Sequence, residues 1–145
     1  MKVPLKIVVL LSLLSGVGVR AETKPAPPVE CGDFLRDLGL GRADVQFVKC
    51  DPIGMHNSFS GGLQAVYRVD GKDIANVEGW LVTFAHVSRL KFACCGWETS
   101  VGSFTARDGA EFTIAMGGET VENRRERFAQ IPYLNLYVTH YFYEP

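Results

Sequence analysis

Four cysteines are the residues of this 145-residue chain best suited to chemistry. Cys94 and Cys95 stand side by side in the apolar run 89–97, and Cys31 and Cys50 precede them. In an exported protein such cysteines indicate disulfides before metal ligation, and the paired CxxC or HxxxH spacing of a zinc site is missing. A bridge between adjacent cysteines needs a strained eight-membered ring. We therefore expect Cys94 and Cys95 each to bond an earlier cysteine.

The run 89–97 itself is predicted to be a buried central strand. Neighbouring side chains in a strand point to opposite faces, so Cys94 and Cys95 could reach partners on both sides of a sheet. Two pairings with Cys31 and Cys50 satisfy this condition, and the sequence does not separate them. Each bridge would close a loop of roughly 45 to 65 residues and stabilise the fold by about 3–4 kcal/mol.

Histidines and carboxylates offer little for catalysis. His56 stands beside Asn57 and Ser58 in a glycine-rich stretch, without the G-x-S-x-G context of a serine hydrolase. Glu98 and Glu111 could serve a glycosidase only if their carboxyl groups lay about 5–10 Å apart. The sequence thus predicts a protein that is not an enzyme and that uses no metal and no cofactor. A small envelope hydrolase is the alternative.

The chain begins like an exported protein. A basic start is followed by the short apolar run 7–14 and by Val19-Arg20-Ala21, which predicts a signal peptide over 1–21, cleavage after Ala21 and a periplasmic location. Its removal takes away three basic residues and no acid, so the net charge falls from −1 to −4. This charge argues against nucleic acid or an anionic membrane as the main partner. A proline-rich leader, 22–30, then precedes a single domain, 31–145.

Periodicity and turn residues predict two helices and six strands within that domain. Asp51-Pro52 is expected to end the first strand, Asp108-Gly109 to form a tight hairpin, and Gly117-Gly118 to break the strand before it. The polar stretch 119–130 has room for a turn of helix. We expect an α+β fold, with a mainly antiparallel sheet and two short helices packed on one face. The predicted helices are 31–39 and 73–86, and the strands are 45–50, 63–69, 89–97, 101–107, 110–116 and 133–143.

The last predicted strand has two different faces. Leu134, Leu136 and Val138 lie on one face, while tyrosines alternate with Asn135 and Thr139 on the other. Tyrosine and arginine are enriched in protein interfaces, so this face and the arginine-rich run 122–127 are candidates for partner binding. Two plainer interpretations remain open. The helices could cover the tyrosine face, and the charged run could be a solvated turn.

Four short motifs also give the chain a resemblance to a known family. Its motifs are C-G-D-F-L at 31–35, F-V-K-C at 47–50, F-A-C-C-G-W at 92–97 and N-R-R at 123–125. With them the chain resembles a family of small exported bacterial proteins of unknown function. It is also similar to the periplasmic immunity proteins encoded beside phospholipase-D-type lipase effectors of the type VI secretion system.

This resemblance implies a protein that binds a cognate toxin in the periplasm and blocks the toxin's active site. An inhibitor of another envelope enzyme, such as lysozyme or a protease, and a structural envelope component are alternatives with the same sequence features. The residues expected to contact the partner lie in predicted loops: His56, Asn57, Phe59, Trp97, Glu98, Asp108, Glu119, Glu122, Arg124 and Arg125.

Overall fold

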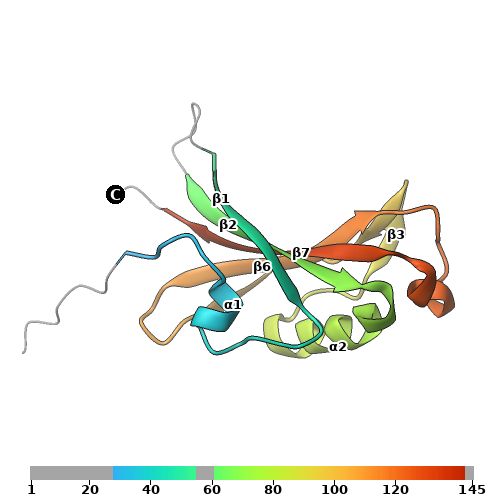
Figure 1. The fold of residues 1–145 in the computed structure, drawn as a ribbon, viewed down its shortest axis with the longest axis horizontal. Helices are drawn as coiled ribbons and strands as arrows, with labels where there is room; N and C mark the ends of the chain where they lie inside the picture. Colours follow the sequence, from blue (N-terminus) through green and yellow to red (C-terminus); the bar gives the residue numbers. More distant parts are fainter. Residues whose placement is uncertain (1–27, 55–60, 143–145) are drawn as a thin grey trace, which may run out of the picture.

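The computed structural model of the chain describes residues 28–54 and 61–142. In this part of the chain seven strands form one antiparallel sheet, accompanied by short helices (Figure 1). The elements are, in chain order, α1 (Phe34–Asp37), β1 (Gln46–Ile53), β2 (Gly62–Asp70), η1 (Gly71–Asp73), α2 (Ile74–Ala85), β3 (Lys91–Ala93), β4 (Gly96–Glu98), β5 (Gly102–Thr105), β6 (Glu111–Glu119), η2 (Arg125–Gln130) and β7 (Tyr133–Tyr141).

The last strand, β7, lies in the middle of the sheet. The strand order is β1-β2-β7-β6-β4-β3, and β5 pairs with the first part of β6, while β4 pairs with its last part. In one register row Val66 faces Tyr137, which in turn faces Ala115. The predicted mainly antiparallel sheet is therefore confirmed, and the short helices beside it are consistent with the predicted α+β class. The strand order could not be read from local sequence patterns.

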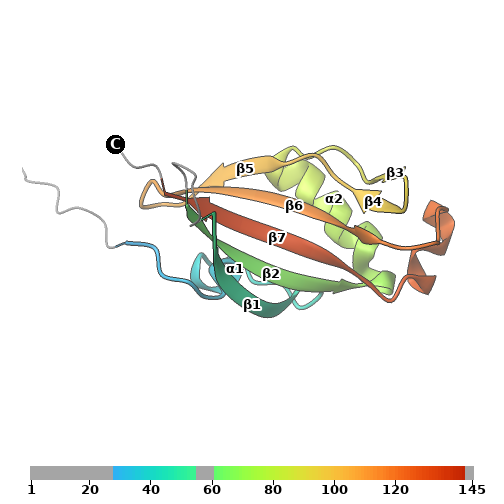
Figure 2. The ribbon, with the colours of Figure 1, turned by 90° about the horizontal axis from the view of Figure 1, so that it is seen from above.

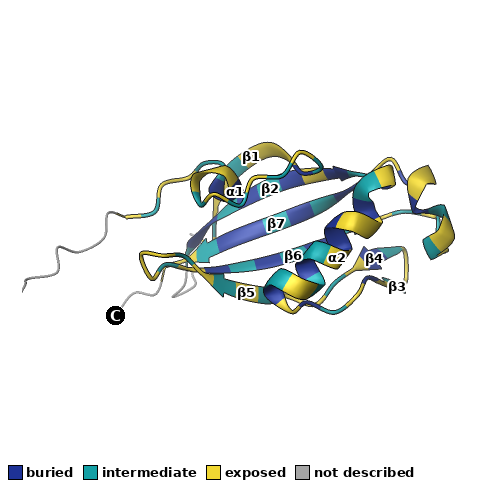
Figure 3. Cartoon of the chain, turned by 90° about the horizontal axis from the view of Figure 1, so that it is seen from below, coloured by how far each residue is buried: buried dark blue, intermediate teal, exposed yellow. Residues whose placement is uncertain are grey.

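One face of the sheet forms the hydrophobic core. Figures 1 and 2 show α1 and α2 on the same side of the sheet, and Figure 3 shows buried strand residues behind them. Because strand side chains alternate, the central strands supply one buried residue in every two to this side. The buried residues are Leu63, Ala65, Tyr67 and Val69 from β2, Phe112, Ile114 and Met116 from β6, and Leu134, Leu136 and Val138 from β7.

Both helices form where the sequence predicts them. The Asp33 carboxylate caps α1 by accepting a hydrogen bond from the Arg36 backbone N at 3.2 Å. Helix α2 ends at Ala85, and the next residue, His86, takes a left-handed conformation with a φ of 54°. Val77 and Leu81, at helical spacing, are fully buried against the core, while the opposite side of α2 is exposed (Figure 3).

Two predicted strand ends are wrong. Strand β1 continues through Pro52, which a sheet tolerates because β1 is an edge strand whose outer side needs no partner. Strand β6 continues through Gly117 and Gly118 to Glu119, because these glycines pair closely with β4. A Cβ atom on Gly117 would lie 2.7 Å from the carbonyl oxygen of Trp97, so glycine at this position permits the close pairing.

The predicted disulfides are also wrong. Cys31 is bonded to Cys50, with the two Cα atoms 5.6 Å apart, and Cys94 and Cys95 are exposed thiols. The run 89–97 is not a central strand. It folds into the hairpin β3–β4 at the edge of the sheet, and the adjacent cysteines occupy its turn. Cys94 has a φ of 55° there, so its side chain cannot follow the alternation of a strand.

The described residues contain no helix that is long and apolar enough to cross a membrane. The predicted signal peptide lies outside the residues that the structure describes.

Candidate protein-binding surface

The side of the sheet that faces away from α1 and α2 carries polar and aromatic side chains. Figure 2 views this side, and no helix of the described chain lies over it. We call it the open face. Tyr133 and Tyr141, at the two ends of β7, are 45% and 37% exposed. The strand registers place on it Lys49, Asp51, Gln64, Val66, Arg68, Thr113, Ala115, Gly117, Tyr133, Asn135, Tyr137, Thr139 and Tyr141.

Contacts between neighbours hold several of these side chains in place. The Arg68 guanidinium lies over the Tyr133 ring, 4.7 Å from its centroid. The Gln64 amide donates a hydrogen bond to the Thr139 hydroxyl at 3.1 Å, and the Asn135 amide donates one to the Tyr137 hydroxyl at 3.3 Å. Side chains that are already ordered lose less conformational entropy when a partner binds. The open face is thus partly preorganised.

Charged pairs occupy the β1 and β2 side of the open face. The Lys49 ammonium lies 2.7 Å from the Asp51 carboxylate, and the hydrogen bond between them raises the pKa of Lys49. The Nε of Arg68 donates to the Asp70 carboxylate at 2.8 Å. Such exposed pairs add little to folding stability, but they set the pattern of charge that a partner meets.

A shallow hollow of about 480 Å³ lies where β4, β6 and β7 meet. The hollow forms because the small residues Gly96, Ala115 and Gly117 lie beside the larger Tyr137. Glu98 and Glu119 also line it. The hollow combines an aromatic wall with two carboxylates, which suits a basic side chain carried on an apolar stem. Local sequence patterns do not reveal this hollow, because a double glycine predicts the end of a strand.

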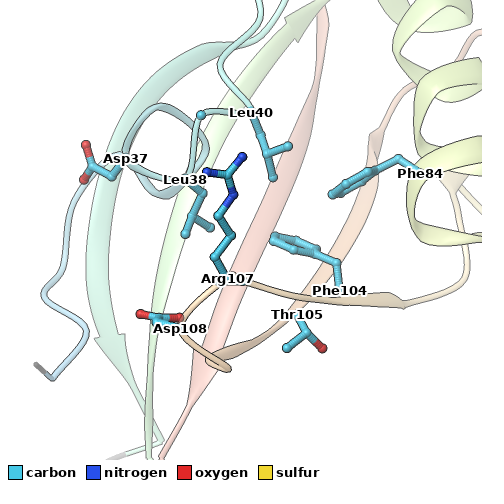
Figure 4. Close-up of a pocket in the computed structure, with 10 residues that line it drawn as sticks. Asp37, Leu38, Leu40, Phe84, Phe104, Thr105, Arg107 and Asp108 are labelled. Carbon is cyan, nitrogen blue, oxygen red and sulfur yellow. The ribbon is translucent and has the colours of Figure 1, made fainter. Parts of the chain in front are cut away.

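A second hollow, of about 680 Å³, lies on the helix side of the sheet (Figure 4). Phe84 of α2 and Phe104 of β5 point toward one another there, with ring centroids 5.1 Å apart. The Arg107 side chain extends between Leu38 and Phe104, whereas the Asp37 carboxylate points away from the cavity (Figure 4). The floor is apolar and the rim carries charges of both signs.

The predicted contact residues are spread over different surfaces. Glu98 and Glu119 line the hollow of the open face, and Asp108 lies at the rim of the hollow in Figure 4. The Glu122 carboxylate is held by Arg127, 3.1 Å away, just before η2, and Arg124 beside it is exposed. His56, Asn57 and Phe59 lie outside the described residues.

Two predicted contact residues point into the protein instead. Trp97 is 5% exposed, packs edge-on against Phe128 at 4.9 Å, and donates from Nε1 to the Glu122 carbonyl oxygen at 2.8 Å. Arg125 donates to the Leu90 carbonyl oxygen at 3.0 Å and pairs with a buried carboxylate of α2. Tryptophan and arginine are common both in interfaces and in structural networks, so residue type alone could not separate these roles.

The carboxylates considered for glycoside hydrolysis do not form a pair. Glu98 lies opposite Gly117, six residues along β6 from Glu111. At about 3.3 Å per strand residue this separates the two positions by roughly 20 Å, well beyond the range that such a reaction uses. Within the described residues, no three His, Cys, Asp or Glu side chains are placed to hold a metal ion.

Comparison with known proteins places the chain in a family. Residues 19–97 match the family described as a domain of unknown function, DUF4952. The chain belongs to this family. No curated protein and no solved structure matches the chain.

The DUF4952 match ends inside β4, so β5, β6, η2 and β7 follow it in the sequence. In the folded protein β7 nevertheless lies between β2 and β6. Most of the open face of this DUF4952 protein, including its tyrosines, thus comes from residues beyond the matched segment.

Proposed function

We propose that this DUF4952 protein is a periplasmic immunity protein that binds a secreted toxin and blocks the toxin's active site. The toxin we propose is a phospholipase-type effector of the type VI secretion system, as the resemblance of the cysteine motifs implies. The observation that carries the binding function is the open face, a rigid antiparallel surface with exposed tyrosines and an acidic hollow. Tyrosine and arginine on a rigid scaffold bind partners at low entropic cost.

The charge of the protein supports a basic partner surface. Without the predicted signal peptide the net charge is −4, and Glu98 and Glu119 concentrate negative charge at the open-face hollow. An enzyme that binds phospholipid headgroups needs cationic groups around its active site. Complementary charge would accelerate association and orient the inhibitor over that site.

The test is to co-express the chain with the toxin encoded by the adjacent gene and to purify the complex. We expect a stable complex and loss of phospholipid hydrolysis at stoichiometric inhibitor. Ala115→Arg, which fills the hollow and reduces its negative charge, should weaken binding at least about tenfold, equivalent to 1.4 kcal/mol. Glu98→Lys, an exposed rim change, should slow association and remove part of its salt dependence.

Arg107→Ser is the matched control, because it alters the hollow on the helix side and leaves the open face intact. It should inhibit like the wild type. If no complex forms and the toxin remains fully active, the immunity function is wrong. If the complex forms but only Arg107→Ser weakens it, the function stands and the helix side is the interface. Capture of a lysozyme or a protease in place of the toxin would instead identify an inhibitor of another envelope enzyme.

A further inference from the structure

The two thiols in the β3–β4 turn are unlike ordinary free cysteines. The Sγ atoms of Cys94 and Cys95 are 2.6 Å apart and both side chains are exposed. The Cys95 backbone N donates to the Ala93 carbonyl oxygen at 2.7 Å, which closes a three-residue turn around Cys94. The φ of Cys94 is 55°, a value that residues with a Cβ atom rarely adopt. The turn thus presents the two thiols side by side.

Reagents can reach the thiols from solvent. Both line a surface hollow of about 600 Å³ together with Phe92 and Glu119. The hairpin lies at the edge of the sheet, and a hydrogen bond of 2.8 Å from the Thr120 backbone N to the Cys95 carbonyl oxygen fixes the base of the turn. The other two cysteines are already joined to each other, so neither is available to Cys94 or Cys95.

We propose that Cys94 and Cys95 form a redox site, a dithiol that closes to a vicinal disulfide by exchange with an external disulfide. In the first step one thiol, as its thiolate, attacks the external disulfide and releases one thiol from it. The second cysteine then attacks the mixed disulfide and releases the other thiol. One Sγ–Sγ bond forms and one external S–S bond breaks. Two electrons and two protons leave with the two released thiols, so the exchange balances.

The new bond is expected to be easily reduced. Neighbouring Cα atoms are about 3.8 Å apart, below the usual 4.4–6.8 Å range of disulfides. The Cys31 and Cys50 Cα atoms, at 5.6 Å, lie within that range. Strained and exposed disulfides are more oxidising than structural ones. The two pairs therefore divide their roles, with Cys31–Cys50 structural and Cys94–Cys95 reversible.

Tryptic digestion separates the two pairs and supplies the test. Peptide 92–107 contains Cys94 and Cys95 and no other cysteine. The purified full chain is treated with oxidised glutathione, and the remaining free thiols are then blocked with an alkylating reagent under acidic conditions. After tryptic digestion the peptide masses are measured by mass spectrometry. We expect peptide 92–107 to lose two hydrogen atoms and to retain no glutathione. Reduced glutathione should restore it at concentrations that leave the bond between Cys31 and Cys50 intact.

Cys95→Ser and Cys94→Ser are the matched variants, since each lacks the second thiol. In each, the remaining cysteine should keep one glutathione, which the wild type should release. Three results would overturn the proposal. In the first, both cysteines of the treated wild type remain free thiols and are alkylated; in the second, the wild type retains glutathione as the variants do. In the third, peptide 92–107 is cross-linked to a peptide that carries Cys31 or Cys50.

Discussion

Arg125 of η2 forms an ion pair with Glu78, a carboxylate of α2 whose side chain is only 2% exposed. The same carboxylate accepts a hydrogen bond from the Leu90 backbone N at 2.7 Å, and Arg125 donates to the Leu90 carbonyl oxygen. Arg125 also lies over the Phe128 ring, 5.1 Å from its centroid. The pair therefore joins α2, the connection to β3, and η2.

Arg125→Met should lower the free energy of unfolding by about 2 kcal/mol, measured by urea denaturation. Removing one partner of a fully buried pair costs about 3–5 kcal/mol, because the other charge stays buried without compensation. The smaller figure reflects the 38% exposure of Arg125 and the Arg89 guanidinium 3.9 Å from the same carboxylate.

Arg124→Met is the control. Arg124 is exposed, and its Nε atom lies 3.7 Å from the Glu122 carboxylate, which is too far for a strong hydrogen bond. It should change stability by less than about 1 kcal/mol. Adding Glu78→Gln to Arg125→Met should recover part of the loss, because it removes the uncompensated charge and keeps an acceptor for Leu90. Equal effects of Arg125→Met and Arg124→Met would show that the pair contributes nothing.

The disulfide between Cys31 and Cys50 joins the segment before α1 to the edge strand β1. With a sequence separation of 19 between the two cysteines, the chain-entropy estimate gives about 3 kcal/mol of stabilisation. Replacing both cysteines by serine should lower the urea midpoint accordingly, and adding reductant to the wild type should produce the same shift. The Cys94→Ser/Cys95→Ser variant should keep the wild-type midpoint. A larger loss in that variant would contradict the structural role assigned to Cys31–Cys50.

Local sequence signals predicted the elements that depend on local chemistry. Asp108-Gly109 forms the expected hairpin, with Gly109 at a φ of 88° and the Asp108 carboxylate accepting from the Ala110 backbone N at 3.0 Å. The alternation in β7 correctly separated the leucine side from the tyrosine side. Both signals reside in a few neighbouring residues, so no knowledge of the rest of the fold was needed.

Features set by distant segments were not predictable in the same way. Gly117 and Gly118 stay in β6 because β4 packs against them, and Cys94 and Cys95 form a turn without any of the usual turn residues. The candidate site likewise has one feature that local sequence predicts and one that depends on distant segments. The tyrosines of the open face were found from periodicity, whereas the hollow beside Tyr137 requires the β4–β6–β7 order.

Asp44 joins the loop before β1 to α2 and should make the fold sensitive to acid. Its carboxylate accepts hydrogen bonds from Arg42, at 2.8 and 2.7 Å, and from the Asn76 amide at 2.6 Å. The bond with Arg42 lowers the pKa of Asp44 in the folded protein. The stabilisation is therefore complete above the unfolded pKa of about 3.9 and is lost as the pH falls through the folded value.

Unfolding measured between about pH 5 and pH 2 should show this loss in the wild type, and Asp44→Asn should have a shallower slope. Asp108→Asn is a control, since this carboxylate only accepts from a backbone N in its own turn. An unchanged acid slope in Asp44→Asn would contradict the role of the Arg42 contact.

Tyr67 should make the fold sensitive to alkali. This β2 residue is 1% exposed, and its hydroxyl oxygen accepts a hydrogen bond from the Leu35 backbone N of α1 at 2.9 Å. Burial raises the pKa of the phenol above its ordinary value of about 10, because the phenolate would lose its hydration. The stability that Tyr67 contributes is therefore complete below that ordinary value and decreases as the pH rises above it toward the folded pKa.

Tyr67→Phe tests both consequences of this arrangement. At neutral pH it should cost about 1–2 kcal/mol, because the buried Leu35 N–H loses its acceptor. Between about pH 9 and pH 11 the variant should lose stability less steeply than the wild type, since the phenol no longer ionises on unfolding. Tyr133→Phe, at an exposed position of the open face, is the control and should leave the neutral stability unchanged. If Tyr67→Phe keeps the wild-type alkaline slope, deprotonation of this phenol does not limit the stability of the fold.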